Sequence, residues 1–249
     1  MIYVSVVSHN HFDLIKEIGC LEELSKHENV KVVIRDNISE SNFDQWCKKH
    51  DIIYTSNNKF NGFGKNHNLN FEQVTKLGAK DNDLFLVLNP DLHIQPSDLL
   101  KLKELMKNHN VFLATINLYR DNNFLQYDNS VRKFPKLKHF VSSILFGVNS
   151  SILNKDKLDD VSYVEWAAGS FLMFQVSTFR MLKGFDEKYY LYCEDIDICK
   201  RYSQVYGENL LFSKSIKGIH YARFNNRKIL SKHFYWHIKS TMRYLLKFR

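Results

Sequence analysis

The sequence predicts an α/β fold built on a mainly parallel central sheet. In the first half of the chain, runs rich in β-branched residues alternate with segments in which apolar residues recur at helical spacing. The 249 residues are 44% hydrophobic and 25% charged, which is the composition of an ordinary globular domain. Alternating strands and helices are usually joined by right-handed crossovers, and such crossovers make the strands parallel.

The strands expected in the first half are residues 2–7, 30–37, 52–56, 83–91 and 111–119. The helices expected between them run from Phe12 to Leu21, around Phe43 and Trp46, from the turn at 61–64 to about Leu77, and from Ser97 to Met106. The weak pattern of 121–163 predicts loops and short elements over the sheet edge. Beyond it we expect a buried strand over 166–174, a helix over 177–183 and the start of another helix in CEDIDICKR, residues 193–201.

The positive charge of the chain is concentrated at its C-terminal end. The formal net charge is +8, and 209–249 holds ten Lys and Arg but no Asp or Glu. The near-neutral remainder argues against a nucleic-acid-binding module, because such domains usually carry a basic stripe across the fold. A local anionic partner is therefore expected, and nucleic acid is not.

The last residues, Ile229 to Arg249, are amphipathic when they are wound as an α-helix. The apolar side chains fall on one arc (Leu230, Phe234, Ile238, Met242, Leu245), and the basic ones fall opposite (Lys232, Lys239, Arg243, Lys247). One interpretation is a helix that packs its apolar face on the domain. The other is a basic face that holds the chain on an anionic membrane surface.

Targeting and redox features predict a cytoplasmic protein. Four cysteines form no C-x-x-C pair, which favours reduced thiols and argues against structural zinc. The N-terminal stretch lacks the basic region of a signal peptide, and no apolar run approaches the length of a membrane span. With the basic helix, this predicts a peripheral protein on the inner face of the plasma membrane.

Polar residues follow several of the expected strands. Ser8, Asp36, Asn89 and Asp91 come at strand ends, and ligands of parallel sheets bind beyond those ends. We therefore expect a nucleotide there. NPD, residues 89–91, is also a common turn, but a carboxylate facing a nucleotide diphosphate would bind a hard divalent cation.

The stretch FNGFGKNHN, residues 60–68, places two glycines before a helix. It matches neither a dinucleotide fingerprint nor a P-loop. One interpretation is a flexible turn. The other is close approach of the backbone at Gly62 to a sugar or phosphate, with Asn66 and Asn68 as hydrogen-bond donors.

Two further groups have both structural and chemical interpretations. Glu194 and Asp195 would stabilise the first turn of a helix, but one of them could also serve as a base for a hydroxyl nucleophile. His220, after a strand-like run, is either structural or, as a neutral imidazole, a second metal ligand.

In content and order these pieces resemble the family 2 inverting glycosyltransferases with a GT-A fold. Within them the chain looks most like bacterial rhamnosyltransferases of O-antigen and related cell-surface polysaccharide synthesis. The stretches that carry the resemblance are VVSHN (6–10), VIRDN (33–37), NGFGKNHN (61–68), FLVLNPDL (85–92), WAAGSF (166–171), GFDEKYYLYCEDIDICKR (184–201) and IHYA (219–222).

The resemblance implies one Rossmann-like GT-A domain over 1–249. Residues 1–119 would form the nucleotide-sugar-binding half, 120–225 the acceptor and catalytic half, and 226–249 the basic helix. Asp195 would be the base, paired with Glu194. Asp91 and His220 would bind Mg²⁺ or Mn²⁺. The donor would be held by Ser8, Asp36, Gly62, Asn66, Asn68, Asn89 and Arg201, and the acceptor by Trp166, Gly169 and Ser170.

The predicted reaction moves L-rhamnose from dTDP-β-L-rhamnose to a lipid-linked sugar, such as undecaprenyl-diphosphate N-acetylglucosamine, with inversion. The same residues would also serve another donor, such as a nucleotide-linked galactofuranose, galactose or glucose. A non-catalytic scaffold of the same fold is a further alternative, which the presence of Asp91, Asp195 and His220 argues against.

Overall fold

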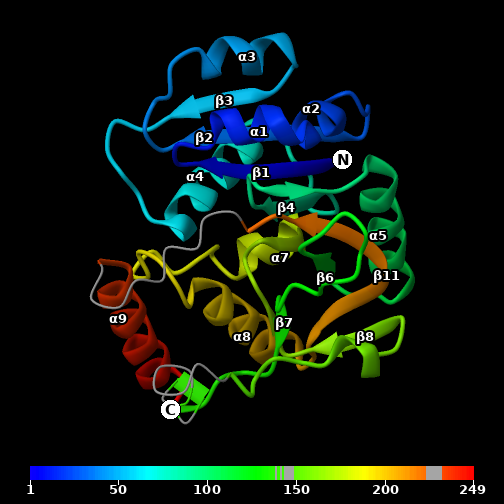
Figure 1. Ribbon diagram of the computed structural model, residues 1–249, viewed down its shortest axis with the longest axis vertical. Helices are drawn as coiled ribbons and strands as arrows, with labels where there is room; N and C mark the ends of the chain where they lie inside the picture. The colour runs from blue at the N-terminus through cyan, green and yellow to red at the C-terminus, as the bar shows by residue number, and fades with distance from the viewer. Residues whose placement is uncertain (138, 141, 143–148, 223–231) are drawn as a thin grey trace.

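The central sheet joins strands from both halves of the chain (Figure 1). The computed structural model describes residues 1–137, 139–140, 142, 149–222 and 232–249, with the side chains of residues 232 and 233 outside this description. Within these residues the sheet has nine strands, in the order β3-β2-β1-β4-β10-β6-β11-β5, with β8 paired to β11. A second, two-stranded sheet pairs β7 with β9.

The first four strands of the sheet are parallel, as expected. They are β3 (Ile53–Ser56), β2 (Val30–Asp36), β1 (Ile2–Ser8) and β4 (Leu84–Leu88). Antiparallel β10 (Phe171–Gln175) joins β4 to β6 (Leu113–Tyr119), and β6 runs parallel to β11 (Leu210–His220). The remaining strands are short: β5 (Leu92–His93), β7 (Val131–Arg132), β8 (Val161–Val164) and β9 (Trp166–Ala167).

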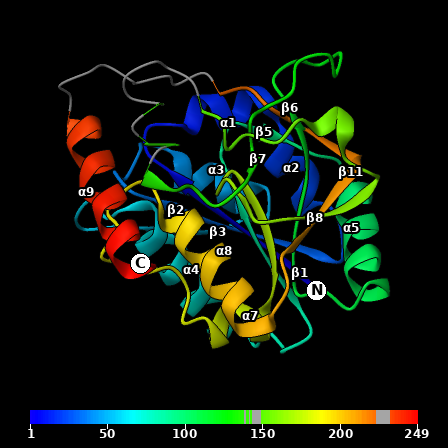
Figure 2. The same cartoon turned by 90° about the horizontal axis from the view of Figure 1, so that it is seen from below.

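Helices cover both faces of the sheet and enclose two apolar cores (Figure 2). One face carries α1 (Phe12–Ile18), α2 (Cys20–Ser25), α3 (Phe43–Lys49) and α5 (Pro96–Asn108). The other carries α4 (Phe63–Lys76), α7 (Val176–Met181), α8 (Glu194–Tyr206) and α9 (Lys232–Lys247). Alternate residues of one strand serve the two cores: Val4 points to the first and Tyr3 to the second.

Two expected elements are divided in the structure. The helix predicted from Phe12 to Leu21 breaks at Gly19, whose φ of 71° caps α1 in the left-handed region. The strand predicted over 166–174 is interrupted between β9 and β10, because the chain turns at 168–170. That turn lies at the carboxyl edge of β4, where Asn89 N donates to Ser170 O at 3.0 Å.

The C-terminal helix is oriented differently from the sequence prediction. Its buried side chains are Ser240, Thr241 and Tyr244, whereas Ile238 and Met242, expected to pack inward, are 41% and 52% exposed. The predicted residues Ile229 and Leu230, and the side chain of Lys232, lie outside the described residues.

The reason is electrostatic, and it corrects the prediction of one free basic face. Arg243 Nη2 and Lys247 Nζ each lie 3.0 Å from Asp186 Oδ2, and Lys247 Nζ lies 2.5 Å from Asp197 Oδ1. Asp197 is completely buried, so an unpaired charge there would be strongly unfavourable. These ion pairs turn two predicted membrane contacts toward the protein; Lys239 remains exposed. No helix among the described residues is long and apolar enough to cross a bilayer.

Candidate active site

The carboxyl ends of β1 and β2 form the first part of the candidate site. Ser8 Oγ donates to Glu40 Oε1 at 2.6 Å, and the other oxygen of Glu40 accepts from Phe12 N at the start of α1. Asp36 Oδ1 accepts from the N–H groups of Ile38 and Ser39.

Asp36 is fully buried and fully hydrogen-bonded. Its Oδ2 accepts from Glu40 N at 2.6 Å and from Tyr54 Oη at 2.9 Å. A carboxylate has about four acceptor positions, so the protein already occupies all of them. Asp36 therefore shapes the loop 36–40, and its predicted contact with the nucleotide-sugar donor stays a prediction.

Gly62 and Asn66 hold the loop before α4. A Cβ at Gly62 would lie 2.1 Å from Tyr190 O, so the close approach at this glycine is to the protein's own backbone. Asn66 is buried, accepts from Asn57 Nδ2 at 2.7 Å and donates to Asn61 O at 3.2 Å.

Asn68 holds the start of the segment that leads to α8. Its Oδ1 accepts from Phe185 N at 2.9 Å, and its Nδ2 donates to Phe185 O at 2.9 Å. Asn66 and Asn68, predicted as donors to a ligand, are thus engaged within the protein and align α4 with the neighbouring segments.

A polar corner forms where β4 ends beside the end of β11. His220 Nε2 lies 3.3 Å from Asp91 Oδ1 and 3.3 Å from Asn89 Nδ2. On the other side of the ring, His220 Nδ1 lies 3.2 Å from Asp128 Oδ2. Burial lowers the pKa of His220, but the hydrogen bonds and charges of Asp128 and Asp91 outweigh it and raise this pKa to about 9. Burial opposes ionisation of Asp91, yet His220 holds the pKa of Asp91 below its ordinary value.

The donor atoms of this corner fit a divalent cation. Asp91 Oδ1 and His220 Nε2 lie 3.3 Å apart, so both would reach one divalent cation once the cation displaces the proton of His220. No set of three or more His, Cys, Asp or Glu side chains within the described part of the chain is placed to hold a metal. The protein would thus supply two ligands and leave the others to phosphate and water, as Mg²⁺ sites usually do.

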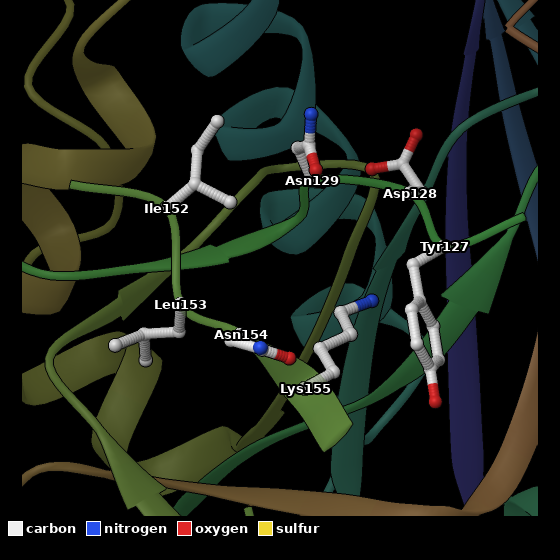
Figure 3. Close-up of a pocket in the computed structure, with 7 residues that line it drawn as sticks. All are labelled: Tyr127, Asp128, Asn129, Ile152, Leu153, Asn154 and Lys155. Atoms are coloured by element: carbon white, nitrogen blue, oxygen red, sulfur yellow. The ribbon is translucent and has the colours of Figure 1, made fainter. Parts of the chain in front are cut away.

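A cavity of about 300 Å³ adjoins this corner (Figure 3). Figure 3 shows Tyr127, Asp128 and Asn129 on one segment and 152–155 on the facing one. Lys155 Nζ donates to Leu118 O at 3.1 Å, and burial lowers the pKa of Lys155 to about 8 although Asp128 opposes this. Lys155 therefore connects the segment 152–155 to the end of β6 behind Asp128.

Glu194 and Asp195 begin α8 and form a pair of carboxyl groups, the second part of the site beside the polar corner at Asp91 and His220. Asp195 Oδ2 accepts from Gly169 N at 3.1 Å, and its Oδ1 accepts from Ile196 N at 2.9 Å. Glu194 is only 5% exposed, and its Oε2 has no hydrogen-bond partner among the described residues. Burial raises the pKa of both carboxyls; the charge of Asp195 raises that of Glu194 further, whereas the two N–H groups favour ionised Asp195.

The backbone before this pair is strained. Tyr192 has a φ of 71° and Cys193 a φ of 65°, which places two consecutive non-glycine residues in the left-handed region. Each such residue is disfavoured by roughly 1–2 kcal/mol, so packing around the start of α8 must stabilise this conformation. The turn allows Glu194 to be buried while the neighbouring Asp195 keeps part of its surface exposed.

The turn at 168–170 connects the carboxyl pair at the start of α8 with the polar corner at the end of β4. Gly169 N binds Asp195, and the next residue, Ser170, accepts from Asn89 N. Ser170 Oγ is itself buried without a hydrogen-bond partner among the described residues. Trp166 is 5% exposed, and its Nε1 donates to Lys133 O at 2.8 Å. Of the three predicted acceptor residues, Gly169 and Ser170 thus lie at the site, whereas Trp166 supports it from the interior.

Arg201 supports α8 and does not extend toward the corner at Asp91. Its Nε donates to Asp197 Oδ2 at 2.7 Å, its Nη2 donates to Gly184 O at 2.9 Å, and its Nη1 donates to Leu182 O. Arg201 and Asp197 are four residues apart on one helix face, so their ion pair and the two backbone contacts hold α8 against the segment before it. The predicted contact of Arg201 with the donor stays a prediction.

Two residues of the site, Asp128 and Glu40, lie in stretches without a local sequence signal. Asp128 lies in the segment of weak pattern, and only the fold brings it to His220. Glu40 lies in an expected loop, where nothing in the local sequence indicated its bonds to Ser8 and to the start of α1.

Comparison with known proteins identifies the family. Residues 3–159 match the family described as glycosyl transferase family 2. Rhamnosyltransferase WbbL of Escherichia coli (strain K12) is 38% identical over 252 residues, covering 100% of this chain and 94% of that protein. An N-acetylglucosaminyl-diphospho-decaprenol L-rhamnosyltransferase of Mycobacterium tuberculosis is 27% identical over 171 residues, covering 66% of this chain and 55% of that protein.

Solved structures share the fold at low sequence identity. GalNAc-T7 with UDP, GalNAc and Mn²⁺ has a TM-score of 0.67 at 12% identity, covering 98% of this chain and 47% of that one. The mannosyltransferase PcManGT of Pyrobaculum calidifontis, with GDP-Man and Mn²⁺, has a TM-score of 0.59 at 13% identity, covering 90% and 58%. The chain thus spans about half the length of these two solved proteins. The family match and the full-length relative together show that the chain belongs to glycosyl transferase family 2 and is a glycosyltransferase with the GT-A fold.

Proposed function

We propose that the protein transfers L-rhamnose from dTDP-β-L-rhamnose to a sugar hydroxyl of a diphosphate-linked lipid, with inversion at the anomeric carbon. One observation carries the proposal: the turn at 168–170 binds Asp195 on one side and the Asn89 backbone on the other. The proposed base and the proposed diphosphate corner would thereby lie on either side of one turn, which supports a single displacement.

In the proposed reaction, the Asp195 carboxylate accepts the proton of the acceptor hydroxyl. The oxygen attacks the anomeric carbon from the face opposite the nucleotide. The carbon–oxygen bond to the diphosphate breaks, and dTDP leaves with the bonding electron pair. Gly169 N and Ile196 N orient the Asp195 carboxylate, and both hydrogen bonds favour its charged form.

Asp91 and His220 would hold a divalent cation against the departing diphosphate. When bound, Mg²⁺ or Mn²⁺ supplies positive charge that stabilises the leaving group. Asp128 orients His220 so that Nε2 faces Asp91 and Nδ1 faces away. Two solved structures of the same fold contain Mn²⁺, which supports the choice of a divalent ion.

The choice of sugar and acceptor comes from the relatives. The full-length relative is a rhamnosyltransferase, and the mycobacterial relative acts on an N-acetylglucosaminyl-diphospho-decaprenol. We propose the corresponding place for this chain in O-antigen or cell-surface polysaccharide synthesis. Another nucleotide sugar is the alternative, since a hexosyltransferase of Haloferax volcanii is also 25% identical over 169 residues.

A donor panel tests the proposal. Transfer to a short-chain diphosphate-linked N-acetylglucosamine should be fastest with dTDP-β-L-rhamnose and should give the inverted, α-linked product by NMR. Asp195→Asn preserves shape but removes the base, so it should lower kcat by roughly 10² to 10⁴ with unchanged donor binding. A faster rate with another nucleotide sugar would overturn the choice of donor. Near-normal turnover of Asp195→Asn would overturn the assignment of the base.

We further propose that the enzyme works as a peripheral protein on the inner face of the plasma membrane. Four exposed apolar side chains on α9 support this proposal: Tyr235, Ile238, Met242 and Leu246. They recur at helical spacing and form a stripe that points away from the buried face of the helix. An interfacial helix that inserts apolar side chains between lipids uses this arrangement.

A further inference from the structure

A second cavity lies between α9 and the segment that leads to α8. Its volume is about 310 Å³, and it is lined by Lys188, Tyr190, Tyr235, Trp236, Lys239, Ser240 and Arg243. Both views of the ribbon show α9 beside this segment (Figures 1 and 2). The residues of the proposed donor corner, Asn89, Asp91 and His220, do not line it, so the cavity is a distinct site.

Among the described residues, three basic side chains and no carboxylate line the cavity. Lys188 and Lys239 are exposed, and neither has an ion-pair partner among the described residues. Arg243 uses Nη2 to bind Asp186, but its Nε is buried without a hydrogen-bond partner in the described structure. A buried N–H without an acceptor is unfavourable by about 1–3 kcal/mol, so an anion that reached it would satisfy an existing deficit.

Aromatic side chains complete the lining. The rings of Tyr190 and Trp236 have centroids 4.7 Å apart and join the two walls. Tyr190 is 41% exposed and Tyr235 is 63% exposed, so both present apolar surface to a ligand. Basic side chains bind phosphate, and aromatic rings pack against a sugar ring or an isoprenoid unit. The cavity therefore suits a ligand in which a phosphate is joined to one of these groups.

The cavity is structurally connected to the catalytic pair. Tyr190 O accepts from Phe63 N at 3.2 Å, and Ser240 Oγ donates to Leu191 O at 2.8 Å. These bonds hold the wall of the cavity four residues before Glu194. The exposed stripe of α9 begins at the cavity with Tyr235 and continues along the helix to Leu246. A lipid tail leaving the cavity along this stripe would reach the proposed membrane surface.

From these observations we infer that the cavity binds the diphosphate of the lipid-linked acceptor, with Lys188, Lys239 and Arg243 as its cations. The inference rests on the proposed function, because that function supplies a diphosphate-linked acceptor. An anionic phospholipid headgroup carries the same phosphate chemistry. The experiment therefore separates these two sources.

The first measurement needs no transfer. The full chain, with its donor site filled by saturating dTDP and Mg²⁺, is titrated calorimetrically with a short-chain isoprenyl diphosphate in the absence of vesicles. Lys188→Gln combined with Lys239→Gln should weaken this binding by about tenfold or more, because charged hydrogen bonds are lost. Lys107→Gln is the control: it removes an exposed cation on α5, which does not line the cavity, and should leave the affinity unchanged. Equal affinity of the double variant and the unmodified chain would overturn the inference, whether or not the enzyme transfers rhamnose.

The second measurement uses turnover. N-acetylglucosamine is offered on the short-chain diphosphate and on a neutral alkyl glycoside of equal chain length. The double variant should raise KM about tenfold for the diphosphate acceptor only, with kcat nearly unchanged. An equal change for both acceptors would overturn the inference. A double variant with a normal KM for the soluble diphosphate acceptor but without binding to anionic vesicles would also overturn the inference. That result would assign the cavity to a phospholipid headgroup. Diphosphate binding without any transfer would instead overturn the proposed function and leave the site in place.

Discussion

Glu194 and Asp195 are neighbours in the sequence but have different surroundings. Asp195 receives two backbone N–H groups and keeps part of its surface exposed. Glu194 is buried, and its Oε2 has no partner among the described residues. Of the two, Asp195 is thus better placed to be ionised and to reach a substrate, and Glu194 is better placed to hold a proton.

Replacing Glu194 by Gln tests this difference through folding stability. The folded-state pKa of Glu194 is raised, so its protonated form is favoured in the folded chain. Its contribution to stability is fully present below the ordinary carboxyl pKa and is lost as pH rises toward the folded pKa. Relative to the unmodified chain, Glu194→Gln should gain stability as pH rises through that window, as measured by denaturant unfolding at a series of pH values. If the free energies of unfolding of the two proteins changed in parallel with pH, the proposed protonation of Glu194 in the folded chain would be contradicted.

The metal corner makes a second prediction at the residue scale. Asp91→Ala and His220→Ala should each weaken calorimetric binding of Mg²⁺–dTDP, because each removes a proposed ligand. Asp128→Asn keeps its size but removes the charge behind His220, and should weaken this binding by about tenfold. Asp159→Asn, at an exposed position, is the matched control. Unchanged affinity in all three test variants would show that the metal is held elsewhere or not used.

At the scale of elements, the start of α4 depends on the absence of a side chain at Gly62. A Cβ there would lie 2.1 Å from Tyr190 O, the carbonyl that also accepts from Phe63 N. The same contact links α4 to the segment before α8, so a shift at Gly62 would move both the second cavity and the approach to Asp195.

Gly62→Ala should therefore lower the free energy of unfolding by about 2 kcal/mol and reduce activity, because the backbone must move. Gly78→Ala is the control: Gly78 has a φ of 85° and no atom within 4 Å of an added Cβ. This variant should be destabilised by about 1 kcal/mol through backbone strain alone, with normal activity. Denaturant unfolding and turnover, measured on both variants, distinguish a local strain from a displaced site. Normal activity of Gly62→Ala would show that the contact between Gly62 and Tyr190 does not position the site.

At the scale of the whole molecule, α9 presents its exposed apolar stripe away from both cores. Arg243 and Lys247 are engaged by Asp186 and Asp197, so they serve first to dock the helix. The proposed membrane contact therefore relies on insertion of apolar side chains, supplemented by Lys239 and not by four free cations.

A vesicle assay tests that contact. Met242→Ser combined with Leu246→Ser should weaken co-sedimentation with anionic vesicles by about tenfold, since side chains that would enter the lipid become polar. Leu125→Ser, at a side chain 78% exposed outside α9, should have no effect. Arg243→Gln and Lys247→Gln should reduce stability more than vesicle binding. Equal sedimentation of the α9 double variant and the unmodified chain would contradict membrane insertion by this stripe.

Much of the fold was predictable because local signals and tertiary structure agree. The strands β4 and β6 are buried along their whole length and β1 nearly so, and their sequences are accordingly rich in apolar residues. Asn89, Asp91 and Asp195 stood out because each lies where a strand or helix must end or begin. Asp128 did not, since its role depends on a contact with His220 across 92 residues of chain.

By itself, the sequence determined the α/β class, the carboxyl edge of the sheet and the acidic start of α8, because periodicity and termini are local properties. Tertiary structure decided the rest. Asn68 and Arg201, predicted to contact the donor, form hydrogen bonds with Phe185 and Asp197 of the same chain. Gly62 lies so close to Tyr190 O that it leaves no room for a side chain. The face on which α9 docks was also undecided, since buried Asp197 attracts Lys247 from 50 residues away. Periodicity reports which side chains share a helix face, but only the partners brought by the fold decide which face is buried.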